Sequence, residues 1–193
     1  MNFKQLEIIG FKSFSEKTNF LIENGLTGIV GPNGCGKSNI VESLRWCMGE
    51  NSAKSMRGSG MEDVIFSGTS NRPSKNISEV ALLLDNHNKE GPAQFKDFDE
   101  ITIRRKIEKD KGSKYFINDK EVRARDVQTF FADMSTGAHS PSLISQGRIG
   151  QLVTAKPIER KSILEEAAGI SGIHARRQEA ETRLNAAENN LKR

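Results

Sequence analysis

The chain has 193 residues, which is enough for one domain with an appendage and for a substantial buried core. Lys and Arg outnumber Asp and Glu by 29 to 25, and the resulting net charge of +4 favours polyanions, either nucleic acid or a nucleotide. No apolar run is long enough to span a membrane and no secretory signal opens the chain, so we expect a cytoplasmic protein without membrane partners.

Three short apolar segments precede a glycine-rich turn. Leu6 to Phe11, Phe20 to Ile22 and Leu26 to Val30 are separated by turn residues, and each is expected to form a strand. From Lys37 the apolar residues recur at the i, i+3, i+4 spacing of a helix that lies on a sheet, and Gly49 ends this helix. This succession predicts a mixed α/β fold.

The glycine-rich turn has the sequence of a phosphate-binding loop. Residues Gly31-Pro32-Asn33-Gly34-Cys35-Gly36-Lys37-Ser38 fit the pattern G-x-x-x-x-G-K-[ST] between a strand-like segment and a helix. The glycines allow backbone N–H groups to surround phosphates, and the helix adds its positive N-terminal end. Lys37 is expected to reach the β- and γ-phosphates, and Ser38 to bind Mg²⁺ through its hydroxyl. The alternative is a turn that binds nothing.

The central part predicts an antiparallel meander. Its expected strands are Ile77 to Leu84, Ile101 to Ile107 and Lys114 to Ile117, joined by polar turns, and a helix is expected from Ala124 to Met134. Asp85 follows an aliphatic strand, as a carboxylate near Mg²⁺ often does in phosphate-loop enzymes. The turn residues after it favour a hairpin instead.

Several polar residues outside the loop are candidates for the same chemistry. Arg57 lies on a glycine-flanked segment from which it can approach the phosphates, or it is a surface arginine. The amide of Gln146 can hold Mg²⁺ and orient water, although most exposed Gln side chains are only solvated. Arg104 to Lys106, and Arg123 with Arg125, form basic clusters that either contact a phosphate backbone or are solvated.

The C-terminal part has a helical pattern. Pro157 suits the first turn of a helix, which Gly169 and Gly172 then interrupt. Beyond them a coiled-coil seam is expected, which needs a partner helix, with a lone solvated helix as the alternative. The seam consists of Ile173, Arg177, Ala180, Leu184, Ala187 and Leu191. The expected domains are an N-terminal lobe over 1–156 and a helical segment over 157–193, with no helix cap at Arg193, as in a truncated helix.

Taken together, these segments resemble the N-terminal head segment of the SMC (structural maintenance of chromosomes) ATPases, in particular those of bacterial chromosome partition. The matching stretches cover nearly the whole chain in the family's order: Gly10 to Phe14, Gly31 to Ile40, Leu44 to Glu50, Ala53 to Gly58, Met61 to Phe66, Gln146 to Ile149 and Glu165 to Ile170. Cys35 departs from the pattern, because serine is commoner there, but backbone contacts to phosphate do not need that side chain. The resemblance implies a P-loop NTPase of the ABC-ATPase type, half of a head with a mixed sheet and an antiparallel subdomain, leading into a coiled coil.

The resemblance also implies the ligands and the residues that hold them. ATP and Mg²⁺ are the expected cofactors, with Gln146 as a Q-loop ligand to Mg²⁺ beside Ser38 and with Arg57 similar to the family's arginine finger. Catalysis would then involve Lys37, Gln146 and Arg57, and Arg123 with Arg125 become candidates for a DNA-facing surface. The residues expected to bind ATP are Pro32, Asn33, Gly34, Cys35, Gly36, Lys37, Ser38 and Asn39, with Asp63, Val64 and Ile65 near the adenine.

The resemblance further implies that the chain is half of an ATPase. In this family the Walker B Asp, the Glu after it and the signature motif lie in a C-terminal half of the head, which demotes Asp85. Hydrolysis is therefore expected only when that half and a second head, in a homodimer, complete the site. The cycle would organise nucleoid DNA in chromosome condensation and segregation with a kleisin-type subunit, and one sheet edge of this half would lack its normal cover. The alternatives are a DNA-repair ATPase of the RecN or RecF kind, a transporter nucleotide-binding domain and a non-catalytic interaction module.

Overall fold

The computed structural model describes residues 1–134, 143, 150, 153–168, 177, 180–182, 184–185 and 187–188. They belong to two compact units, Met1–Gln128 and Thr129–Arg193. The elements are β1 (Asn2–Ile9), β2 (Thr18–Leu21), α1 (Lys37–Cys47), the 3₁₀ helices η1 (Lys54–Met56) and η2 (Met61–Val64), β3 (Ile77–Asp85), η3 (Ala93–Phe95), β4 (Glu100–Glu108), β5 (Gly112–Ile117), β6 (Lys120–Val122), α2 (Ala124–Asp133) and α4 (Pro157–Ala167). Within the described part of the chain, no helix has the length and apolarity needed to cross a membrane.

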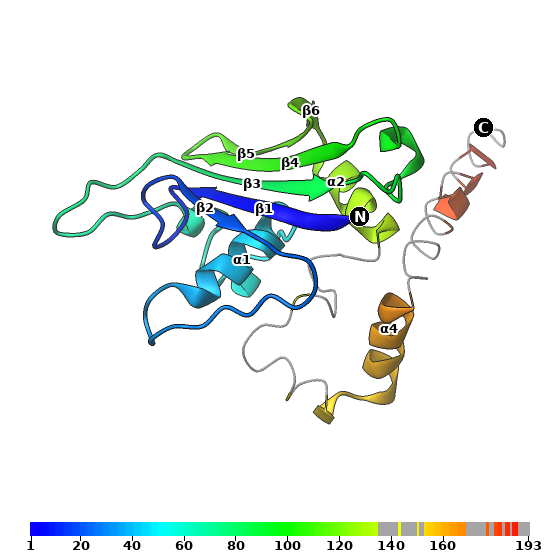
Figure 1. Cartoon of the computed structure of the whole chain (residues 1–193), viewed down its shortest axis with the longest axis horizontal. Helices are drawn as coiled ribbons and strands as arrows, with labels where there is room; N and C mark the ends of the chain where they lie inside the picture. Colours follow the sequence, from blue (N-terminus) through cyan, green and yellow to red (C-terminus); the bar gives the residue numbers. More distant parts are fainter. Residues whose placement is uncertain are drawn as a thin grey trace. The chain divides into compact units, whose positions relative to one another are not determined.

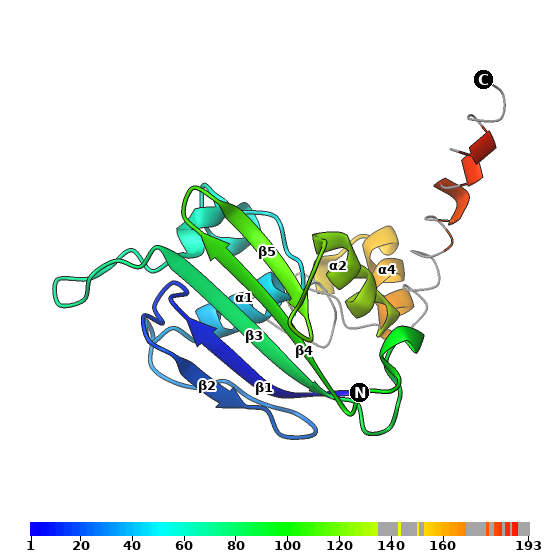
Figure 2. The same ribbon diagram turned by 90° about the horizontal axis from the view of Figure 1, so that it is seen from above.

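The strands form one sheet in the order β2-β1-β3-β4-β5-β6. Figure 2 shows β2, β1, β3, β4 and β5 side by side in this order. Every neighbouring pair is antiparallel, and the β3–β4 ladder runs without a break from Ile77 opposite Glu108 to Asp85 opposite Glu100. The predicted meander is therefore confirmed. Strand β6 was not predicted, because three polar-flanked residues are too few to show an alternating pattern.

One face of this sheet forms the core, because apolar residues alternate along the strands. Helix α1 packs against β3 and β4 on that face (Figure 1). Its Trp46 and Cys47 are fully buried, as the predicted apolar stripe requires. The buried hydrophobic residues of the strands are Leu6, Ile8, Val80, Leu82, Leu84, Ile101, Ile103, Ile107, Tyr115 and Ile117.

Helix α1 ends where the sequence predicted. Gly49 has φ 101°, a left-handed value that favours glycine, and its N–H donates to Trp46 O at 3.1 Å. A Cβ at this position would lie 2.7 Å from Gln128 Cγ, so the turn also needs the missing side chain. Helix α2 agrees with the helix predicted from Ala124 to Met134 within one residue.

The segment Leu26 to Val30 is not a strand, contrary to the prediction. Leu26 is 100% exposed and Val30 is 92% exposed, and the trace approaches α1 as an extended loop (Figure 1). A strand exists only where its N–H and C=O groups find a ladder partner. Among the described residues no strand lies beside this segment to supply one.

In the unit Thr129–Arg193, helix α4 begins at Pro157 as predicted. The Arg160 guanidinium holds the preceding turn, because it donates to Ala155 O at 2.8 Å and to Val153 O at 3.0 Å. Of the predicted seam, the exposed helical residues Arg177, Ala180, Leu184 and Ala187 are described, whereas Ile173 and Leu191 lie outside the described residues. Gly169 and Gly172, which were predicted to interrupt the helix, lie outside them too. The seam and the expected domain boundary at 156 remain predictions.

Candidate nucleotide site

The predicted phosphate loop lies at the N-terminus of α1. Residues Gly31 to Cys35 are exposed, and the helix begins at Lys37, directly after them. Gly36 is the N-cap in a left-handed conformation with φ 92°, and a Cβ there would lie 2.8 Å from Ser13 Oγ. Both the conformation and the close approach require glycine, so the sequence pattern and the local geometry agree.

The Lys37 ammonium lies inside the curve of this loop. Its Nζ donates to Gly31 O at 2.6 Å and to Pro32 O, and it lies 3.9 Å from Cys35 Sγ. The loop therefore surrounds a half-buried positive charge whose contacts, among the described residues, are two backbone carbonyls and a thiol. A bound anion at this position would find the ammonium and the first-turn N–H groups of α1 together.

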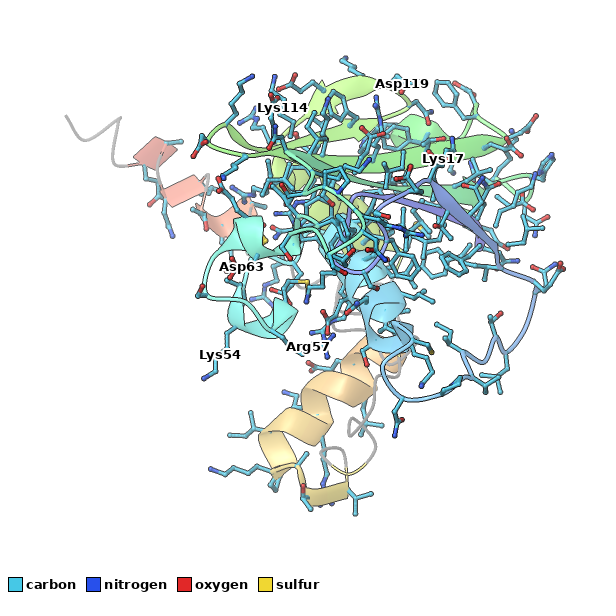
Figure 3. All side chains as sticks on the ribbon, turned by 90° about the vertical axis from the view of Figure 1, so that its left-hand side faces the viewer. Lys17, Lys54, Arg57, Asp63, Lys114 and Asp119 are labelled. Carbon is cyan, nitrogen blue, oxygen red and sulfur yellow. The ribbon has the colours of Figure 1, made fainter. Side chains whose placement is uncertain are left out.

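Arg57 is held beside the loop by residues of α1. Its Nη2 donates to Asn39 Oδ1 at 2.8 Å, and its Nε pairs with Glu42 Oε1 at 2.5 Å. The side chain is 57% exposed and lies at the end of η1, next to α1 (Figure 3). The structure thus brings Arg57 and Asn39, two predicted site residues, into direct contact.

Asp63, Val64 and Ile65 lie at the end of η2. The Asp63 carboxylate accepts hydrogen bonds from Ser59 N at 2.7 Å, Ser59 Oγ at 2.8 Å and Gly60 N at 3.0 Å, and these bonds, above all that of Gly60, hold its pKa below the usual value. Val64 is buried, and its carbonyl accepts from Lys12 N at 2.7 Å. In this structure the Asp63 carboxylate therefore caps η2.

The remaining predicted site residues are Gln146, proposed for Mg²⁺, and Arg123 with Arg125, proposed for DNA. Gln146 lies outside the described residues. Arg123 and Arg125 are exposed at the start of α2, where Arg123 N donates to Asp126 Oδ2 at 3.0 Å. Their predicted DNA contacts remain predictions.

The basic cluster Arg104 to Lys106 does not form one surface, contrary to both interpretations offered from the sequence. Alternation along β4 places Arg105 on the core face, where it is 2% exposed, with Arg104 and Lys106 on the opposite face. The Arg105 guanidinium lies 4.4 Å from the Trp46 ring centroid and 4.6 Å from that of Tyr115, and burial lowers its pKa. Arg105 is a core residue.

Asp85 lies in the hairpin that the turn residues favoured. It ends β3, pairs with Glu100 across the ladder, and accepts from His87 N at 3.0 Å and contacts His87 Nδ1 at 2.5 Å. The bonds from His87 lower the Asp85 pKa, and the Asp85 side chain raises the pKa of His87. These contacts connect Asp85 to its own turn.

Sequence reasoning missed Glu42 and Lys12. The Glu42 side chain is 10% exposed, and its Oε2 pairs with Lys12 Nζ at 2.5 Å, while Lys12 Nζ also donates to Met56 O. The sequence did contain a signal for Glu42, because a charged residue on the buried side of the amphipathic helix α1 usually has a partner of opposite charge.

Comparison with known proteins shows which family the chain matches. The family model described as "RecF/RecN/SMC N terminal domain" matches residues 2–147. The chain is 60% identical over 193 residues to "Chromosome partition protein Smc" of Cereibacter sphaeroides, and 57% identical to the protein of the same name from Rhodopseudomonas palustris. In both cases the match covers 100% of this chain and 17% of the relative.

Solved structures of SMC heads have the same fold. A head bound to the C-winged helix domain of ScpA matches with a TM-score of 0.80 and 32% identity, over 89% of this chain and 52% of that one. A head with an extended coiled coil, bound to a ScpA domain derived from Pyrococcus furiosus, matches with a TM-score of 0.78 and 32% identity, over 99% and 48%. The expected fold class, half of an ABC-type ATPase head, is confirmed. The chain therefore belongs to the RecF/RecN/SMC N-terminal domain family, and within it is similar to the bacterial chromosome partition Smc proteins.

Proposed function

We infer that this chain is the ATP-binding N-terminal half of an SMC ATPase head, which uses ATP-driven head dimerisation to bind and organise DNA in chromosome condensation and segregation. The observation that carries the proposal is the loop Gly31 to Ser38, which opens α1 and surrounds the Lys37 ammonium. It occurs in a chain that is 60% identical over its full length to a chromosome partition protein.

The residues of the loop fit a nucleotide phosphate and Mg²⁺. Gly36 provides the left-handed turn, with φ 92°, that brings the loop to the N-terminus of α1, and the Lys37 ammonium can exchange its carbonyl contacts for phosphate oxygens. Ser38, in the first turn of α1, and Gln146 are the oxygen donors proposed for Mg²⁺. When bound, Mg²⁺ would neutralise charge on the β- and γ-phosphates. Asp63, Val64 and Ile65 are the residues proposed near the adenine.

The proposed function requires groups beyond those of this chain. The chain spans about a sixth of the length of the relatives, and about half of the solved head bound to the ScpA winged helix. We assign the remaining half of the head, with the Walker B and signature motifs, to a C-terminal segment, and hydrolysis to the dimer of two completed heads. A similar solved structure, described as structural biochemistry of ATP-driven dimerization and DNA stimulated activation of SMC ATPases, supports this assignment, and heads bound to ScpA support a kleisin-type partner at the nucleoid.

The first experiment is to sequence the reading frame beyond codon 193 in the source DNA. Continuation through heptads to a signature motif and an apolar strand ending in Asp-Glu supports the proposal. The full gene product is then tested for ATP binding and for ATP-dependent dimerisation by light scattering, with EDTA as the control. A stop codon after Arg193, or a full gene product that binds no ATP, contradicts the proposal.

A further inference from the structure

We propose that Glu42 is a positioning residue for Arg57, needed for the guanidinium to act at the phosphate loop. The inference rests on the proposed function, in which Arg57 stabilises charge on the nucleotide. The Glu42 carboxylate contacts Lys12 and Arg57, and it is not among the residues proposed to bind the nucleotide. Its role follows from a network of described contacts that join two separate segments of the chain, Lys12 with Ser13 and Met56 with Arg57, to α1.

The Glu42 carboxylate is buried and doubly paired. It lies on α1 one turn beyond Ser38, and its side chain is 10% exposed. Oε1 pairs with Arg57 Nε at 2.5 Å and Oε2 pairs with Lys12 Nζ at 2.5 Å. Because water reaches this carboxylate little, each contact is stronger than a surface pair of the same length.

The contacts fix the plane of the guanidinium and leave one side of it open. Arg57 Nε is held by Glu42 and Nη2 by Asn39, whose Nδ2 donates to Ser13 Oγ at 2.8 Å. Two contacts to a rigid planar group define its orientation. Nη1 has no partner among the described residues, and the side chain is 57% exposed. Arg57 is therefore oriented at the edge of the loop with donors still available.

Glu42 also supports the backbone at Arg57. Arg57 has φ 54°, a left-handed conformation that is unfavourable for a residue with a side chain. Lys12, which Glu42 pairs with, donates to Met56 O, the carbonyl immediately before Arg57. The single carboxylate therefore restrains both the side chain of Arg57 and the turn from which it extends.

The experiment compares Glu42→Gln and Arg57→Ala in the full gene product. The amide has nearly the volume of the carboxylate but no charge, so both ion pairs weaken while the helix keeps its packing. We expect Glu42→Gln to lower kcat about tenfold, since a misplacement of about 1 Å can cost about a hundredfold. The Kd for ATP should change less than about twofold. The double variant should be no slower than Arg57→Ala alone, because residues that act as one unit are not additive.

A second readout does not depend on turnover. The N–H groups of Met56, Arg57 and Gly58 bond to carbonyls of Ala53 and Lys54 at 2.9 to 3.0 Å. Without nucleotide, hydrogen exchange in a peptide covering these residues should become faster in Glu42→Gln. The matched control is Glu7→Gln, since Glu7 on β1 also pairs with a lysine, Lys17, at 2.7 Å, but far along the chain from Arg57. It should leave both kcat and this exchange unchanged.

Each outcome separates the two proposals. If Arg57→Ala leaves kcat unchanged, the arginine assignment fails, and the positioning role fails with it. If Arg57→Ala lowers kcat but Glu42→Gln changes neither kcat nor exchange, only the positioning role is wrong. A double variant much slower than Arg57→Ala also overturns it, because Glu42 would then act through another group. If Glu42→Gln does not fold, Glu42→Asp decides: the charge is retained but the side chain is shorter by one methylene group, so kcat should fall several-fold and exchange should become faster, and an unchanged kcat with unchanged exchange overturns the positioning role.

Discussion

Replacement of Arg105 by Met should destabilise the folded chain strongly, although it removes a buried charge. Arg105 Nη1 donates to Trp46 O at 2.8 Å and to Glu50 O at 2.6 Å, and these carbonyls lie at and beyond the C-terminal end of α1. The guanidinium also stacks against Trp46 and Tyr115. Met fills the space of the aliphatic stem but provides no donor, so both carbonyls lose a charged partner.

The magnitude follows from these contacts. Two hydrogen bonds from a charged donor contribute about 1.5 kcal/mol each, and the two ring contacts together contribute about 1 kcal/mol. Burial of the charge is unfavourable: it lowers the Arg105 pKa, and the buried Nε has no hydrogen-bond partner among the described residues. Removal of the charge therefore stabilises the variant by about 1 kcal/mol, which offsets part of the loss. We therefore expect the free energy of unfolding to fall by about 3 kcal/mol.

The assay is urea unfolding followed by the fluorescence of Trp46, the single tryptophan of the sequence. With a slope of about 2 kcal/mol per molar urea, the midpoint should decrease by about 1.5 M. The control is Arg104→Met, since Arg104 is the same residue type one position earlier on the opposite face, 27% exposed and paired with Asp119 at 2.9 Å. Its effect should stay below about 1 kcal/mol. An Arg105→Met chain as stable as the wild type would refute the reasoning, because desolvation would then outweigh the contacts.

Three further predictions concern the site, the surface and the hairpin. Lys37→Ala should abolish ATP binding by the full gene product in calorimetry, and an unchanged affinity would reject the loop assignment. Charge reversal at Arg123 and Arg125 should weaken DNA binding more at low salt than at high salt in anisotropy titrations, whereas indifference to the change would place the DNA surface elsewhere. Asp85 raises the pKa of His87, so this pairing stabilises the fold below the unfolded His pKa of about 6.5 and is lost as pH rises through the folded value. An NMR titration should show the raised pKa of His87, and Asp85→Asn should lower it toward the usual value, with Asp99 and Glu100 still raising it.

The sequence predicted the elements whose signals are local. The apolar segment Ile77 to Leu84, followed by turn residues, predicted β3, and the phosphate-loop motif predicted the turn that opens α1. The strand predicted for Leu26 to Val30 was wrong, because an apolar segment becomes a strand only beside a partner strand, which no local pattern reveals.

The predictions for the polar residues Arg105 and Glu42 were wrong or missing for a related reason. Charge alone suggested a surface for Arg105, but its place on the core face depends on the register of β4 and on the rings of Trp46 and Tyr115. Glu42 was missed because its partners, Lys12 and Arg57, come from segments distant in the sequence. Such pairings are properties of the tertiary structure, so the motif located the phosphate loop but not the residues that support it.

The neighbouring positions of β1 and β3 in the sheet have a consequence for the integrity of the site. The two strands pair from Asn2 opposite Asp85 to Ile9 opposite Glu79, and the whole stretch 10–76, with the phosphate loop and Arg57, lies between them in the chain. A single proteolytic cut in this stretch, for example in the exposed segment Leu26 to Val30, would therefore leave two fragments joined by the ladder. The nicked protein should migrate as one species on a sizing column and separate only in denaturant.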